Sequence, residues 1–112
     1  MLTEPLALRW DEQDFTEVRP GVFGATIDTD QLTVTVYRYE PGCRWEEHSH
    51  PEDQVTFIAE GGIVEFVVGG RRMALSPGQL AVIPGGLPHS ASVPEDGERV
   101  VTVNVWPPRK RS

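Results

Sequence analysis

Apolar residues recur at every second position along short segments of this chain, and glycine, proline and aspartate separate the segments. Side chains of a β-strand alternate between its two faces, so a period of two is typical of half-buried strands. The pattern predicts an all-β protein without a long helix. The expected strands are Val22–Asp28, Gln31–Glu40, Arg44–His48, Gln54–Glu60, Ile63–Val68, Arg71–Leu75, Gln79–Ile83, His89–Val93 and Glu98–Trp106.

The breaks between these segments carry strong turn signals. The chain has 11 glycines and 10 prolines, and Gly69-Gly70 stands between two apolar runs, which marks a β-hairpin. Closely spaced turns imply antiparallel pairing. A single sheet of such strands would leave one face and two edges exposed, so we expect a sandwich or a closed barrel. Residues 1–20 are expected to run along this barrel or to form a first edge strand.

Length and charge limit the alternatives. A chain of 112 residues fits one domain, 1–112. The 17 acidic and 10 basic residues give a net charge of −7, which argues against binding to nucleic acid or to an anionic membrane. One cysteine, Cys43, excludes an intramolecular disulfide. The sequence contains no apolar stretch of membrane-spanning length and does not open like a signal peptide, so we expect a cytoplasmic protein.

The three histidines are the main candidates for chemistry. His48 and His50 are two residues apart, so an extended strand points both toward one face. Gln54 follows a short turn, and His89 comes from a later strand. Three imidazoles and one amide oxygen suit one divalent transition metal per chain, Zn, Ni, Fe, Mn or Co, with open positions for water or substrate. The alternative is that each histidine has an ordinary structural place.

The glycines and prolines around these histidines resemble the cupin family. Gly42, His48, His50, Gln54 and Gly61 match its first motif (42–61) in spacing, although glutamine replaces the usual glutamate. A second set matches the second motif (78–93), with Val93 in place of the usual asparagine; it consists of Gly78, Pro84, Gly86 and His89. The resemblance implies a double-stranded β-helix, or jelly roll, that is usually a homodimer and holds one metal on His48, His50, Gln54 and His89.

A narrower resemblance is to the cupins of pectin degradation, which open unsaturated uronate sugars. It rests on residues 48–54 and on the C-terminal run, where the branch places an acid, an aromatic and an arginine. Asn104, Trp106 and Arg109 stand near those places and are the candidate catalytic residues, although an amide cannot exchange a proton as an acid does. Residues 109–112 otherwise form a basic tail. Similar small cupins include aromatic polyketide cyclases.

Alternation divides the last strand into two faces. Val101, Val103 and Val105 form an all-valine face, expected to pack between sheets or at a dimer contact. Thr102 and Asn104 lie on the other face, which either lines a polar cavity or meets solvent. Tyr37 and Tyr39 likewise share a face that either lines the pocket or does not.

The ligand set suggests the chemistry. A neutral amide in place of a carboxylate leaves the full +2 charge of a metal uncompensated, which strengthens its Lewis acidity and disfavours oxygen chemistry. We expect a metal-dependent enzyme of carbonyl or enolate chemistry, of isomerase, lyase or cyclase type, acting on a small sugar acid or cyclic ketone. The alternatives are a non-catalytic cupin that binds or senses a small molecule, and a cupin dioxygenase.

Overall fold

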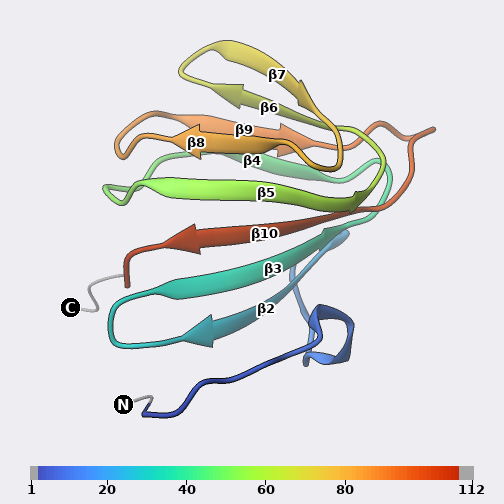
Figure 1. The fold of residues 1–112 in the computed structure, drawn as a ribbon. Helices are drawn as coiled ribbons and strands as arrows, with labels where there is room; N and C mark the ends of the chain where they lie inside the picture. The colour runs from blue at the N-terminus through green and yellow to red at the C-terminus, as the bar shows by residue number, and fades with distance from the viewer. Residues whose placement is uncertain (1–2, 109–112) are drawn as a thin grey trace.

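The computed structural model describes residues 3–108, which form two antiparallel sheets (Figure 1). A short 3-10 helix, η1 (Trp10–Glu12), precedes them. The larger sheet has the order β1 (Thr16–Arg19), β2 (Val22–Asp28), β3 (Thr33–Tyr39), β10 (Val100–Trp106), β5 (Gln54–Gly61) and β8 (Leu80–Ile83). The smaller sheet has the order β4 (Arg44–His48), β9 (His89–Ser92), β6 (Val64–Val68) and β7 (Arg71–Leu75).

Strand order shows the jelly-roll topology. The last strand, β10, pairs with β3 and β5, and β9 pairs with β4 and β6, so strands far apart in sequence lie side by side (Figure 1). Apolar side chains from both sheets form one core, with Ile58 and Val100 from the larger sheet and Val64 and Phe66 from the smaller. The predicted all-β double-stranded β-helix is confirmed.

All nine predicted strands are present, with small differences at their ends. β3 begins at Thr33 and β10 at Val100, each two residues later than expected. Before β3 the chain makes a turn, in which the carbonyl oxygen of Leu32 accepts the N–H of Thr29. The N-terminal segment supplies β1 as an edge strand beside β2. No helix within residues 3–108 is long and apolar enough to cross a membrane.

The predicted Gly69-Gly70 hairpin joins β6 to β7. Both glycines have positive φ angles, 54° and 81°. Two adjacent left-handed residues give the turn whose twist matches that of paired strands, and glycine adopts them without a Cβ clash.

The two faces of β10 differ in burial. Thr102 and Asn104 point inward and are fully buried, whereas Val103 and Val105 lie half-buried on the outer face of the larger sheet. Of the two places expected for the valine face, packing between the two sheets is therefore wrong for Val103 and Val105, and the dimer contact stays a prediction. The inward face tolerates threonine and asparagine because their polar atoms are hydrogen-bonded to neighbouring strands.

Two loops at one end of the molecule pack backbone to backbone. Gly86 donates its N–H to the carbonyl oxygen of His50 at 2.8 Å, and Gly85 donates to a carboxylate oxygen of Asp53 at 2.8 Å. A Cβ on Gly85 would overlap the carbonyl oxygen of Pro51. This close approach holds the loop that carries His50 against the loop that leads to His89.

We expect Gly85→Ala to destabilise the protein by about 1–3 kcal/mol, because the added methyl must push the two loops apart. Denaturant unfolding measures the change. Gly97→Ala is the control, since Gly97 is also a loop glycine without a left-handed φ, and its added Cβ would come no closer than 3.2 Å to the Pro94 oxygen. Equal stability of the two variants would contradict the role given to the contact.

Candidate metal centre

The three histidines converge at the loop end of the smaller sheet. His48 ends β4 and pairs directly with His89, the first residue of β9, while His50 lies two residues beyond β4. Their ring centroids are 4.3 Å (His48–His89), 4.9 Å (His50–His89) and 5.8 Å (His48–His50) apart. One nitrogen of each ring lies within 4.8 Å of the other two. The predicted convergence is confirmed.

Backbone carbonyls fix the orientation of all three imidazoles. The Nδ1 atoms of His48, His50 and His89 each lie 2.9 Å from a carbonyl oxygen two residues away. These carbonyls belong to Glu46, Glu52 and Leu87. A carbonyl only accepts, so each Nδ1 carries a hydrogen and donates it. In the neutral ring the Nε2 lone pair is then left facing the centre of the cluster, which is the form that binds a metal.

Gln54 adds an oxygen to the same point. It is the first residue of β5, and its Oε1 lies 3.0 Å from Nε2 of His50. When His50 is neutral, these are two acceptors facing each other. Nε2 of His89 is also buried, with no hydrogen-bond partner among the described residues. A cation between these atoms would satisfy all of them, so the donor set fits the metal that the sequence predicted.

Electrostatics favour the neutral imidazoles. Burial lowers the pKa of His48 and of His89 below the ordinary histidine value, and repulsion from the neighbouring histidines lowers both further. Desolvation disfavours the imidazolium because the charged form loses more hydration than the neutral one. Both rings therefore present free lone pairs at neutral pH.

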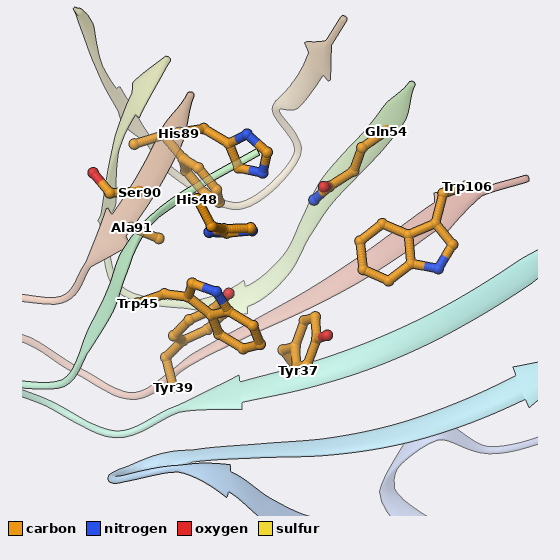
Figure 2. A pocket seen from close by; sticks show the side chains of 10 residues that line it. Tyr37, Tyr39, Trp45, His48, Gln54, His89, Ser90, Ala91 and Trp106 are labelled. Atoms are coloured by element: carbon orange, nitrogen blue, oxygen red, sulfur yellow. The ribbon is translucent and has the colours of Figure 1, made fainter. Parts of the chain in front are cut away.

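A pocket between the two sheets opens onto this cluster (Figure 2). It encloses about 350 Å³, its open mouth included. His48 and His89 reach it from the smaller sheet, and Gln54 reaches it from the larger (Figure 2). The other lining residues are Tyr37, Tyr39, Trp45, Phe66, Ser90, Ala91 and Trp106. Of the two possibilities left open for Tyr37 and Tyr39, both side chains thus line the pocket.

The pocket wall is aromatic and uncharged. The rings of Tyr37 and Trp45 meet edge to face with centroids 4.9 Å apart. Burial raises the pKa of Tyr39, so its phenol stays protonated. Nε1 of Trp45 is buried without a hydrogen-bond partner among residues 3–108. No Asp, Glu, Lys or Arg in that range lines the pocket.

The three candidate catalytic residues have different places. Trp106 lines the pocket, with its ring 5.8 Å from that of His50. Asn104 lies behind Gln54, buried and hydrogen-bonded to it at 3.2 Å, and does not line the pocket. Arg109 and the rest of the basic tail lie outside the described residues. The catalytic roles stay predictions.

Sequence reasoning missed several pocket residues. Trp45 gave no signal beyond its place three residues before His48. Ala91 could have been found by counting two residues on from His89, and Phe66 is its direct partner across the sheet. Thr56, which lies behind Gln54 and does not line the pocket, follows it by two residues and so shares its inward face. Cys43 is buried, and burial raises the pKa of its thiol to about 11.

Solved structures with this fold are numerous. KdgF from Halomonas sp. is 24% identical, with a TM-score of 0.82 over 96% of each chain. The polyketide cyclase RemF from Streptomyces resistomycificus is 19% identical, with a TM-score of 0.85 over 97% of this chain and 83% of that one. A sugar phosphate isomerase from Silicibacter pomeroyi is 18% identical, with a TM-score of 0.76 over 93% and 76%.

These identities are low, so the likenesses show the fold alone. No curated protein matches the chain in sequence. The family model of the cupin domain, however, matches residues 35–106, a span that includes all four candidate ligands and most strands of both sheets. The chain therefore belongs to the cupin family.

Proposed function

We propose that the protein is a cytoplasmic, metal-dependent enzyme of carbonyl or enolate chemistry. Its substrate would be a small oxygenated molecule such as a sugar acid or a cyclic ketone. One observation carries the proposal. Three imidazole lone pairs and one amide oxygen meet beside a pocket. His48, His89 and Gln54 line that pocket, and its other described lining residues are uncharged.

His48, His50, His89 and Gln54 would hold the metal, which supplies Lewis acidity to a substrate oxygen when bound. All four ligands are neutral, so they do not offset the charge of a divalent ion. Such a site favours ligands that carry or develop negative charge on oxygen, as an enolate does. Which ion is bound depends on supply as well as on ligand type, since imidazole and amide oxygen suit several.

The chain itself provides the walls that would position a substrate. Trp45, Tyr37 and Trp106 offer ring faces and edges to an apolar or cyclic part of a ligand. The unpartnered Nε1–H of Trp45 can donate to a ligand oxygen. Two similar folds are named as a polyketide cyclase and a sugar phosphate isomerase, which fits this substrate range.

The second candidate is a non-catalytic cupin that binds or senses a small molecule. The uncharged lining favours it, because an enzyme of proton transfer needs a group that takes up a proton near neutral pH. A dioxygenase is the third candidate, and the neutral ligand set argues against it because non-haem iron oxygenases commonly rely on a carboxylate.

Turnover distinguishes the three. We expect the metal-loaded protein to convert a sugar acid or cyclic ketone without consuming dissolved oxygen, measured with an oxygen electrode beside product analysis. Saturable binding that leaves the ligand unchanged would support the sensor instead. Oxygen consumption by the iron-loaded protein in proportion to product would support the dioxygenase.

We expect the gently purified protein to carry close to one divalent ion per chain by elemental analysis. His89→Ala should lose more of the bound metal than Gln54→Ala, since an imidazole is a stronger ligand than an amide. Arg71→Ala is the matched control, because Arg71 is exposed at a hairpin away from the pocket. If neither the native protein nor protein reloaded with Zn, Ni, Mn, Co or Fe(II) holds stoichiometric metal, the metal centre is wrong.

We also propose a homodimer that covers the outer face of β5, β8 and β10. Leu80 and Val82 are 60% and 69% exposed on the edge strand β8. Leu80 pairs across the sheet with Phe57, and Phe57 with Val103, so apolar side chains continue over three strands. A second copy would cover this face and pair the free edge of β8.

Light scattering should give a mass near twice the chain mass of 12.4 kDa. Val82→Lys should yield monomers, because it places a charge in the contact. Val18→Lys is the control, since Val18 is 47% exposed on β1 at the opposite edge of the same sheet. A native monomer at micromolar concentration would refute the dimer.

A further inference from the structure

We propose that Asn104 is a positioning residue for the metal centre. Through a buried chain of hydrogen bonds it decides which end of the Gln54 amide faces the histidines. The proposal deepens the proposed function and rests on its metal site. It gives Asn104 a role that needs no contact with substrate.

The chain of hydrogen bonds starts at a backbone carbonyl. Nδ2 of Asn104 donates to the carbonyl oxygen of Thr35 at 3.1 Å and to Oγ1 of Thr102 at 2.9 Å. A carbonyl cannot donate, so the nitrogen of Asn104 must face Thr35. Asn104 is 1% exposed, and no water can replace these partners without opening the core. Its Oδ1 is therefore fixed on the opposite side, toward β5.

The direction of hydrogen bonding then passes to Gln54. Oδ1 of Asn104 accepts from Oγ1 of Thr56 at 2.7 Å and from Nε2 of Gln54 at 3.2 Å. Nε2 of Gln54 also donates to Oγ1 of Thr56 at 2.8 Å. Both amide hydrogens of Gln54 are thus used on the side away from the histidines. Its Oε1 faces Nε2 of His50 at 3.0 Å.

If the oxygen and nitrogen of the Gln54 amide exchanged places, both of their contacts would become unfavourable. Its oxygen would face Oδ1 of Asn104, acceptor against acceptor, and its nitrogen would replace the oxygen at the metal position. An amide nitrogen keeps its lone pair in resonance with the carbonyl and does not serve as a ligand there. The orientation of Asn104 therefore selects the ligating end of Gln54.

Strand register makes this arrangement possible. Asn104 on the central strand β10 lies directly opposite Thr35 on β3 and directly opposite Thr56 on β5. Gln54 is two residues before Thr56, so it lies on the same inward face and within reach of Asn104. The chain of hydrogen bonds thus crosses three adjacent strands without a loop residue.

The difference between an amide and a carboxylate distinguishes an orienting role of Asn104 from a role in fold stability alone. The two ends of an amide differ, whereas the two oxygens of a carboxylate are equivalent. A glutamate at position 54 therefore needs no orienting partner. Loss of Asn104 should weaken metal binding when residue 54 is glutamine and should not weaken it when residue 54 is glutamate.

The experiment measures zinc affinity by competition with a chromophoric chelator. We expect Asn104→Leu to weaken Zn²⁺ binding about 10–100-fold, the range found when a group that orients a ligand is removed. In a Gln54→Ala background and in a Gln54→Glu background the same change should have no further weakening effect. The visible absorption of the Co²⁺-loaded Asn104→Leu protein should shift toward that of the Gln54→Ala protein.

Thr35→Val is the matched control. It removes another buried hydroxyl beside Asn104, whose side-chain bond goes to Thr26 at 3.1 Å, and it keeps the backbone carbonyl that anchors Asn104. Zinc affinity should stay within about twofold of the native value. If Asn104→Leu does not fold, Thr56→Val tests the same chain and should weaken zinc binding only while Gln54 is present.

The outcomes distinguish failure of the metal site from failure of the positioning role of Asn104. If the native protein binds no Zn²⁺, the metal site is wrong and the role of Asn104 is wrong with it. If the native protein binds Zn²⁺ but Asn104→Leu weakens binding equally in all three backgrounds, or in none, only the positioning role is overturned.

Discussion

Burial of polar atoms between two β-sheets is the constraint on which this structure depends. Gln54, Thr56, Thr102 and Asn104 are almost fully enclosed beside an apolar core. A buried donor or acceptor without a partner costs about 1–3 kcal/mol. Each of these groups therefore has to find its partner on a neighbouring strand, and the register of β3, β10 and β5 supplies it. The buried polar groups therefore specify the strand register, as the apolar core does.

The same requirement shapes the histidines. The carbonyls that accept from their Nδ1 atoms lie in the strand end and the loops next to each histidine, so local backbone conformation sets the tautomer. The tight contact between Gly85 and Pro51 keeps two of those loops in place. Preorganisation here comes from the backbone, and a metal would meet lone pairs already directed at it.

Most of the fold was predictable because the apolar alternation and the turn residues both agree with it. Alternation located all nine expected strands, and glycine pairs located the hairpin at residues 69–70. The convergence of the four candidate ligands was predictable from their spacing. The direction of the β10 faces was not, because valine and threonine both suit a strand and only the partners of Asn104 decide which side turns inward. Trp45 and Phe66 reach the pocket from β4 and β6 through tertiary packing, which spacing along the chain does not encode.

An amide as the proposed fourth ligand links the charge of the metal site to the buried hydrogen bonds. A carboxylate would bind a divalent ion more tightly and need no orientation, but it would cancel half of the charge that polarises a bound oxygen. As a ligand, Gln54 would keep that charge, but its oxygen and not its nitrogen would have to face the metal. Asn104 and Thr56 hold the amide nitrogen away from the histidines, and Asn104 is in turn hydrogen-bonded to the Thr35 backbone. In the proposed site, the Lewis acidity of a bound metal would therefore depend on the backbone carbonyl of Thr35 on β3, which is separated from Gln54 on β5 by β10.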